Sequence, residues 1–198
     1  MMRERVVASI KRGEVVILPL EHSYVYACDA FSLAAVNRLH QLRNDPEGVA
    51  AQVIIGKVET LAGLAQGLTP AVQDLTREFW PGMLTLKLPQ NQSLNWDLGD
   101  GGALNEFAVR VPNQRETLEV LNETGPLAIA SATFAGGVPV ILAPASSEME
   151  SFDIGELTAG PLSTVVAVAG ENLTIVRVGA VTFEELKKVV SAIELASE

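Results

Sequence analysis

Hydroxyl and cationic side chains stand near the ends of apolar runs, where binding clefts are commonly built. Arg110 lies in the apolar run 107–111, so a guanidinium that faces inward must find an anionic partner, either a ligand or an acid of the chain. Ser131 and Thr133 come just before a glycine pair at 136–137. Hydroxyls and backbone amides there could hold an anion, although a glycine pair after a strand is more often a simple turn. The chemistry that these residues indicate is anion binding.

The other candidate binding residues are one arginine and two histidines. Arg43 has the fork of donors that suits a phosphate, yet Asp45 and Glu47 are close enough in sequence to pair with it and neutralise the site. His22 could accept a hydrogen bond from a substrate or titrate near neutral pH, and it could equally be a loop histidine with no special role. His40 falls in a helical pattern and is predicted to be a solvated or packing residue.

The common catalytic signatures are absent from the sequence. There is no G-x-x-x-x-G-K-[ST], no G-x-G-x-x-G after a strand, no G-x-S-x-G and no H-E-x-x-H. Cys28 is the one cysteine, which excludes an internal disulfide and a cysteine-based zinc cluster, and we expect it to be an inert buried thiol. With two histidines in the chain, no metal site is expected.

Apolar periodicity predicts the elements that position these side chains. Helices are expected at 3–12, 32–43, 58–66, 69–79, 115–122 and from a capping box at 182 to about residue 195. Strands are expected at 14–19, 49–55, 83–88, 106–111, 126–130, 138–142, 163–168 and 173–178, and residues 19–29 are expected to form a loop at a strand's end. Because several strands follow one another directly, the sheet is predicted to be mixed rather than purely parallel.

Composition limits the class of protein. The chain has 198 residues, of which 48% are hydrophobic and 19% charged, so we expect one globular domain over residues 1–198. The longest uncharged stretch, 124–147, contains glycines and prolines that exclude an uninterrupted membrane helix, and no membrane partner is expected. The charged start at 1–13 does not resemble an export signal, and the single cysteine suits a reducing compartment, so a cytoplasmic location is expected.

Four segments in a fixed order carry a family resemblance. They are I-L-P-L-E-H-S-Y-V-Y-A-C-D-A at 17–30, F-W-P-G-M-L-T-L at 79–86, F-A-V-R-V-P at 107–112 and I-A-S-A-T-F-A-G at 129–136. In this order they resemble the YrdC-type, or threonylcarbamoyl-adenylate synthase, family. The resemblance covers most of the chain and implies an α/β (α+β) fold, in which helices flank a twisted mixed sheet around a concave cleft.

The resemblance also implies a reaction. Members of the family join L-threonine, bicarbonate and ATP, usually with magnesium, into threonylcarbamoyl-adenylate and pyrophosphate for the modification of tRNA. A carbamate oxygen attacks the α-phosphorus, so the protein mainly positions the reactants and neutralises phosphate charge. The family's basic concave face suggests tRNA or double-stranded RNA binding, which the net charge of −10 of this chain disfavours.

This sequence departs from the family pattern at the substrate-binding motifs. The family's P-T-[DE]-T-x-Y-G-L appears as P-L-E-H-S-Y-V-Y at 19–26, so Leu20 and His22 replace two threonines. The K-x-R-P motif aligns with R-N-D-P at 43–46, which puts Asp45 in the place of an arginine. At a separation of ~5 Å and an effective dielectric of ~20, a unit charge pair is worth roughly 3 kcal/mol, so this reversal is predicted to prevent ATP from binding there as it does in active members.

Other positions keep the family's residue types. Arg110 and Arg177 stand where the resemblance places nucleotide-facing arginines, Ser163 opens an S-T-V-V segment, and S-x-N becomes S-A-T at 131–133. No catalytic residue is assigned. The predicted set for binding substrate or nucleotide is His22, Arg43, Arg110, Ser131, Thr133, Ser163 and Arg177.

Two functions of different class fit this sequence. The first is a divergent threonylcarbamoyl-adenylate synthase that still holds ATP, threonine and bicarbonate. The second is a catalytically degenerate paralogue that keeps the fold and binds a nucleotide, another anion or a protein partner.

Overall fold

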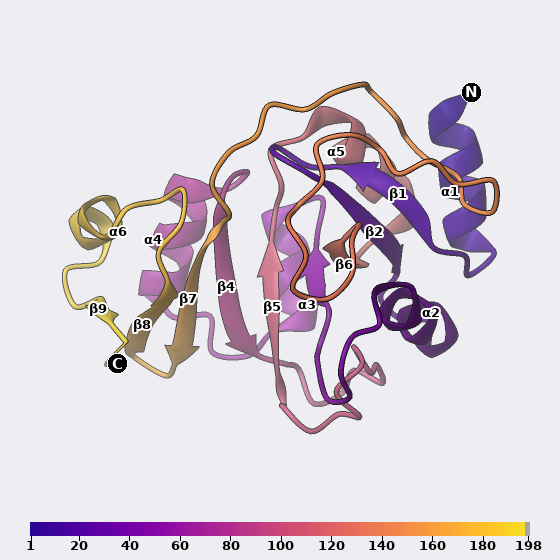
Figure 1. The fold of residues 1–198 in the computed structure, drawn as a ribbon. Coiled ribbons are helices and arrows are strands. Elements are labelled where there is room, and N and C mark those ends of the chain that lie inside the picture. The colour runs from indigo at the N-terminus through magenta and orange to yellow at the C-terminus, as the bar shows by residue number, and fades with distance from the viewer. Residues whose placement is uncertain (197–198) are drawn as a thin grey trace.

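One mixed sheet of nine strands forms the centre of the computed structural model, which describes residues 1–196. In chain order the strands are β1 (Val16–Pro19), β2 (Tyr24–Asp29), β3 (Gln52–Ile54), β4 (Leu84–Pro89), β5 (Glu106–Arg110), β6 (Leu127–Ser131), β7 (Thr164–Ala169), β8 (Asn172–Arg177) and β9 (Glu194–Leu195). Their order across the sheet is β1-β2-β6-β3-β5-β4-β7-β8-β9 (Figure 1). The pairs β3–β5, β4–β7 and β8–β9 are parallel and the others antiparallel, which confirms the predicted mixed sheet.

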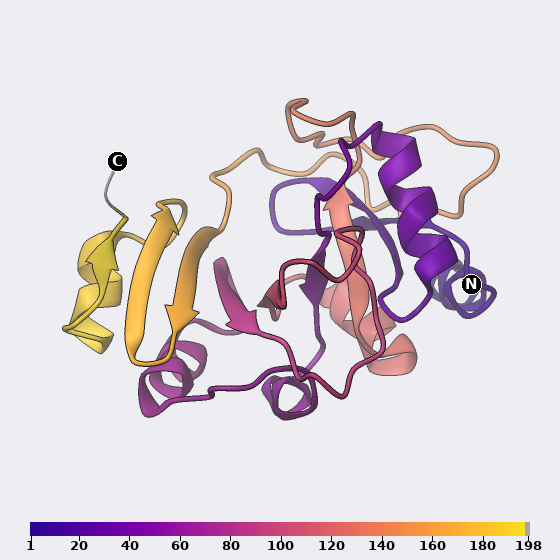
Figure 2. The ribbon, with the colours of Figure 1, turned by 90° about the horizontal axis from the view of Figure 1, so that it is seen from below.

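Helices cover both faces of this sheet. They are α1 (Met2–Lys11), α2 (Leu33–Arg43), a 3-10 turn η1 (Val58–Thr60), α3 (Leu61–Leu64), α4 (Pro70–Phe79), α5 (Arg115–Thr124) and α6 (Phe183–Val189). Figure 2 shows α3, α4 and α5 on one face, with α2 and the long segment 132–163 on the other. Within residues 1–196, no helix combines the length and apolarity needed to cross a lipid bilayer.

Local sequence signals explain where the helices begin. The Ser32 hydroxyl accepts a hydrogen bond from the backbone of Ala35 at the start of α2. Thr69 caps α4, with proline at the first helical position, at the start of the helix predicted at 69–79. Thr182 and Glu185 form the predicted capping box of α6.

The segment 24–29 is a strand, where the sequence predicts a loop. Tyr24 pairs with Pro19 and the strand runs antiparallel to β1, so only residues 20–23 form the turn of a hairpin. The backbone NH of Leu20 donates to the Ser23 carbonyl at 2.8 Å, which closes that turn. Pro19 is the last residue of β1, a position where a strand tolerates proline. The chain turns after it and pairs again with β1 as β2.

Two other predicted elements differ from the structure. Residues 138–142 form no strand. The carbonyls of Val140 and Ile141 each accept one backbone hydrogen bond, from Tyr24 and Leu157. Pro139 and the nearby glycines cannot sustain a ladder of such bonds. The closing helix ends at Val189 rather than near 195, and the chain then buries Ile193 and adds β9 beside β8.

The long segment 132–163 is attached to the sheet by Tyr24. This tyrosine is fully buried, and its hydroxyl contacts the carboxylate of Asp153, the carbonyl of Gly155 and the backbone NH of Ile154 at 3.1, 2.7 and 3.0 Å. The backbone of Ile17 bonds to the same segment, at Glu150 and Phe152. These bonds attach residues 150–155 to the sheet, and residues 160–163 of the same segment line a cleft.

Candidate functional site

A cleft of about 460 Å³ opens on the sheet face that carries α2 and the segment 132–163. Its walls come from the 20–23 turn, the last turns of α2, residues 49–52, the ends of β5 and β6, and residues 160–163. Parts far apart in the sequence therefore meet at one site, in agreement with the concave cleft that the resemblance implies.

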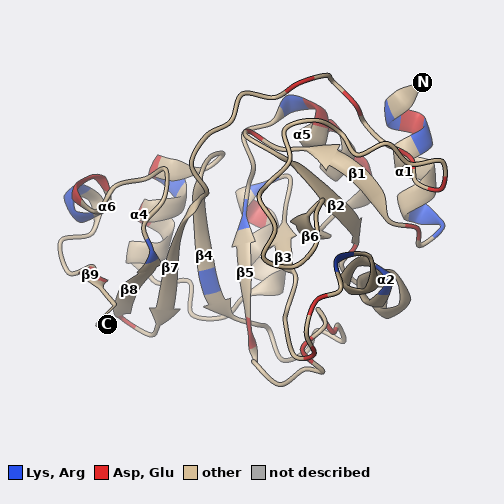
Figure 3. Cartoon of the chain, in the orientation of Figure 1, with Lys and Arg blue, Asp and Glu red and all other residues tan. Residues whose placement is uncertain are grey.

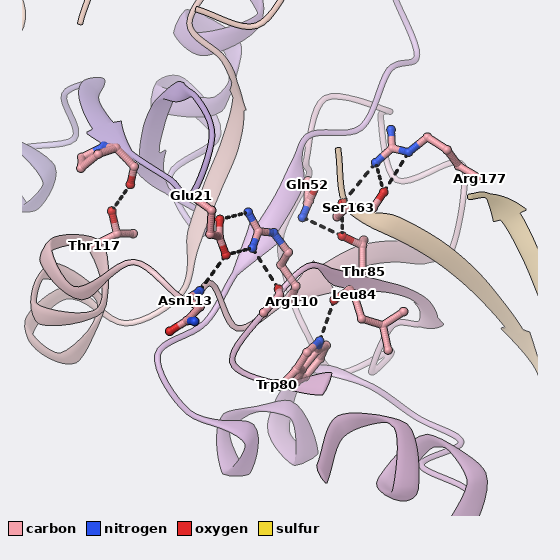
Figure 4. A network of polar contacts seen from close by, with 12 residues as sticks. Glu21, Gln52, Trp80, Leu84, Thr85, Arg110, Asn113, Thr117, Ser163 and Arg177 are labelled. Carbon is pink, nitrogen blue, oxygen red and sulfur yellow. Dashed lines mark hydrogen bonds and ion pairs between the residues drawn. The ribbon is translucent and has the colours of Figure 1, made fainter. Parts of the chain in front are cut away.

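Arg110 is paired with an acid of the chain at the base of this cleft (Figure 4). Its two terminal nitrogens donate to the Glu21 carboxylate at 2.6 and 2.8 Å, and one of them also donates to the carbonyl of Gly82 at 3.0 Å. The backbone NH of Asn113 donates to the same carboxylate at 2.7 Å. The sequence left open whether the anionic partner of Arg110 is a ligand or an acid of the chain. The structure shows that it is an acid, Glu21.

The Glu21–Arg110 pair is buried, with 12% and 5% of the two side chains exposed. Burial alone raises the pKa of Glu21, but the hydrogen bonds and charge of Arg110 outweigh it and hold the pKa below its ordinary value. Both residues stand at positions where this chain matches the family motifs. The pair fastens the 20–23 turn to the end of β5.

A second internal pair lies at the end of α2. The Arg43 Nε donates to Asp45 at 2.9 Å, and its Nη1 donates to the backbone carbonyls of Ser131 and Thr133 at 2.5 and 2.9 Å. The side chains of Arg43 and Asp45 are 13% and 4% exposed. Arg43 therefore takes the neutralising alternative, with Asp45 rather than Glu47 as its partner.

This pair changes the electrostatic expectation at Asp45. The Asp45 carboxylate is paired with Arg43, so the predicted repulsion between Asp45 and a phosphate is largely cancelled. The same contact occupies the guanidinium that was expected to bind phosphate. Where the family motif supplies two cations, this chain supplies a pair with no net charge.

Arg177 is the cleft arginine without such a partner. Its Nε and Nη2 donate to the Ser163 carbonyl at 3.1 and 2.9 Å, and Nη2 also reaches the Ser163 hydroxyl at 3.1 Å. Among residues 1–196, no carboxylate lies within ion-pair distance of it. Partial burial lowers the pKa of Arg177, because the guanidinium loses water without gaining a counter-ion. An anionic ligand would supply that counter-ion.

The family model of Sua5, YciO and YrdC proteins, described as "Telomere recombination", matches residues 8–179. This chain belongs to that family. A Mycobacterium tuberculosis protein, provisionally named a threonylcarbamoyl-AMP synthase, is 33% identical over 193 residues, which cover 92% of this chain and 86% of the relative. The threonylcarbamoyl-AMP synthase of Bacillus subtilis is 28% identical over 95% of this chain and 56% of its own length.

Solved structures support the same family assignment. The crystal structure of Pyrococcus abyssi Sua5 complexed with L-threonine superposes with a TM-score of 0.89 at 27% identity, covering 98% of this chain and 58% of that one. Escherichia coli YciO matches with a TM-score of 0.73 at 17% identity and shows the fold alone. The chain spans little more than half the length of the Sua5 protein it resembles.

Six of the seven predicted site residues of this family member line the cleft, namely His22, Arg43, Arg110, Ser131, Ser163 and Arg177. Thr133 lies instead beside an adjoining apolar groove of about 630 Å³. The Nδ1 of His22 contacts the Thr158 carbonyl at 3.0 Å, so this ring nitrogen is already occupied within the chain. The backbone NH of Gly137 donates to the Phe134 carbonyl, which supports a simple turn at the glycine pair rather than an anion-binding site.

His40 belongs to the cleft wall, which the sequence prediction of a solvated or packing residue missed. Its Nδ1 contacts Asp45 at 2.9 Å and its Nε2 contacts the Leu98 carbonyl at 2.8 Å. Asn44 ends α2 in a left-handed conformation, with φ of 53°, which turns Asp45 back towards His40. An asparagine just past a helix, followed by an acid, is the signal that could have indicated this contact.

Neither the cysteine nor a metal cluster adds chemistry to the cleft in the described part of the chain. Cys28 is fully buried, and burial raises its pKa to about 12, so its thiolate is not available at neutral pH. Within residues 1–196, no three histidine, cysteine, aspartate or glutamate side chains gather as metal ligands.

Proposed function

We propose that the cleft binds a nucleoside triphosphate of the ATP class with magnesium, and that this binding serves the formation of L-threonylcarbamoyladenylate. The observation that carries the proposal is Arg177, an exposed cation that lines the cleft and has no carboxylate within ion-pair distance in residues 1–196. It stands where the resemblance places a nucleotide-facing arginine. The naming of relatives as threonylcarbamoyl-AMP synthases supports the reaction.

In this reaction the chain would act by position and charge. The amine of L-threonine and bicarbonate give a carbamate with loss of water, and a carbamate oxygen then attacks the α-phosphorus of ATP as pyrophosphate leaves. Arg177 would offset the phosphate charge, and the Ser163 hydroxyl beside it would donate to a phosphate oxygen. The use of the product in tRNA modification follows from the same proposal.

A second candidate function is favoured by the Arg43–Asp45 pair. That pair leaves no net positive charge where the resemblance expects two cations, and Leu20 offers no hydroxyl to an amino-acid substrate. A family member with this cleft would bind a nucleotide or another phosphate-bearing anion without completing the synthesis.

Direct RNA binding is not part of either proposal. The segment 132–163, which borders the cleft, carries four acids and no lysine or arginine. In Figure 3 the only charged residues of the segment 132–163 are acidic, whereas α1 and α6 carry both acidic and basic residues. Such a surface repels a phosphate backbone.

Pyrophosphate release distinguishes the two candidates. The purified chain is incubated with ATP and magnesium, with and without both L-threonine and bicarbonate, beside the B. subtilis relative as a control. Release that requires both co-substrates and falls in Arg177→Gln establishes the synthase. Binding of ATP without release establishes the second candidate, and absence of both contradicts the proposal.

A further inference from the structure

A chain of polar contacts crosses the floor of the cleft behind Ser163. The Gln52 Nε2 donates to the Thr85 hydroxyl at 3.2 Å, and the Thr85 and Ser163 hydroxyls lie 2.9 Å apart. The Arg177 Nη2 then donates to the Ser163 hydroxyl oxygen at 3.1 Å (Figure 4). Gln52 and Thr85 belong to strands β3 and β4 and have no part in the proposed chemistry so far.

The direction of the hydrogen bond between the two hydroxyls follows from counting protons. Thr85 is 1% exposed and already accepts from Gln52, and among residues 1–196 the acceptor within reach of its own proton is Ser163. If Ser163 donated to Thr85, the Thr85 proton would remain buried without an acceptor, which is energetically costly. Thr85 is therefore the donor.

The Ser163 oxygen then has both of its lone pairs occupied. One accepts from Thr85 and the other from Arg177, and the proton of Ser163 itself is unused. Ser163 lines the cleft, so this proton can point only to the cleft side, to water or to a ligand.

We infer that Gln52 and Thr85 are positioning residues, which aim the Ser163 hydroxyl proton at an anionic oxygen of the ligand beside Arg177. This inference rests on the proposed nucleotide binding. The guanidinium and the hydroxyl then present donors only, which selects a phosphoryl or carboxylate oxygen and disfavours any group that must itself donate.

The backbone around Ser163 is rigid enough to keep this direction. The Thr164 amide donates to the Met83 carbonyl at 2.9 Å, and the Thr164 hydroxyl accepts from the backbone of Gly179 and Val181 at 2.8 and 3.0 Å. Thr85 lies opposite Val165 in the register of β4 and β7. Thr85 is thus held within β4, and Ser163 directly precedes the first residue of the neighbouring strand β7.

A double-mutant cycle tests the inference. ATP with magnesium, and separately inorganic pyrophosphate, are titrated calorimetrically into the wild-type chain, Thr85→Val, Thr85→Ser, Ser163→Ala and the double variant Thr85→Val/Ser163→Ala. Thr85→Val keeps the side-chain shape and is expected to weaken binding about tenfold, the usual worth of one hydrogen bond to a charged group. Thr85→Ser keeps the hydroxyl and is expected to bind as the wild type does.

The cycle separates positioning from a structural effect. In the Ser163→Ala background, Thr85→Val should cause no further loss, because the proton that it orients is gone. Equal weakening in both backgrounds, or no weakening by Thr85→Val in a wild-type background, would overturn the inference while leaving nucleotide binding intact. Absence of binding by the wild type itself would overturn the proposed function and the inference together. Thermal unfolding of each variant verifies that it is folded.

Discussion

Asp45 lies against Arg43, with 2.9 Å between its Oδ2 and the arginine Nε, at the position where the family motif would place a second cation. The contact turns the expected pair of phosphate-binding cations into an internal ion pair. His40 and the backbone of residues 131–133 share the same cluster. In the proposed function, the charge of a phosphate ligand is therefore met mainly by Arg177.

Restoring the family's residues should strengthen binding of ATP and L-threonine. In the variant Leu20→Thr/His22→Thr/Asp45→Arg/Thr133→Asn, the internal pair is lost and hydroxyl and amide donors return to the cleft. Charge-assisted contacts are worth ~1.5–3 kcal/mol each, so a gain of at least about tenfold in ATP affinity is expected by calorimetry. A folded variant with no gain would show that the cleft geometry itself has changed.

Removing Glu21 should destabilise the fold. Glu21→Ala leaves Arg110 buried without an anion, and breaking a buried pair costs about 3–5 kcal/mol. Urea unfolding measures this free energy. Asp74→Ala is the matched control, because its partner Arg77 is exposed and surface pairs are worth about 1 kcal/mol or less. Similar losses in both variants would contradict the role given to the pair.

The same pair predicts how stability depends on pH. The pKa of Glu21 is lower in the folded chain than in the unfolded chain, so the folded state binds fewer protons. Its stabilising effect is fully present above the unfolded pKa of about 4.3 and is lost as the pH falls through the folded value. Glu21→Gln should therefore flatten the acid side of a plot of unfolding free energy against pH. A slope equal to that of the wild type would exclude Glu21 as the source.

Cys28 should be inert in the folded protein. Its thiol is fully buried and its pKa is raised to about 12, chiefly by burial, so little thiolate forms at pH 8. Iodoacetamide is expected to leave the native chain unmodified and to alkylate it completely in urea. Rapid modification of the native chain, read by mass spectrometry, would contradict this burial.

The sequence predicted most of the fold because local signals and the family resemblance agree. Helix caps at Ser32, Thr69 and Thr182 mark real helix starts, and continuous apolar runs mark the central strands. The strand 24–29 was missed because its polar approach, E-H-S at 21–23, is typical of a loop and its pairing with β1 depends on contacts outside the segment. The false strand at 138–142 was apolar enough, but Pro139 and the glycines that precede it at 136–137 prevent a ladder.

The sequence predicted several residues that line the cleft, but it did not predict which side chains contact one another there. Arg110 required an anion by its burial alone, but only the fold reveals that Glu21 supplies it from the hairpin turn. The choice of Asp45 as the partner of Arg43 depends on the left-handed turn at Asn44, which sequence spacing does not specify. Residue types give the chemistry of a cleft, whereas charge pairing inside it is set by tertiary geometry.

The most direct test of the account is a calorimetric titration of the chain with ATP and magnesium, comparing the wild type, Arg177→Gln and the surface control Arg77→Gln. Saturable binding by the wild type and the control, weakened about tenfold or more in Arg177→Gln, is the predicted result. Equal affinity in all three proteins, or no binding by the wild type, would contradict the claim that this cleft meets a phosphate ligand through Arg177.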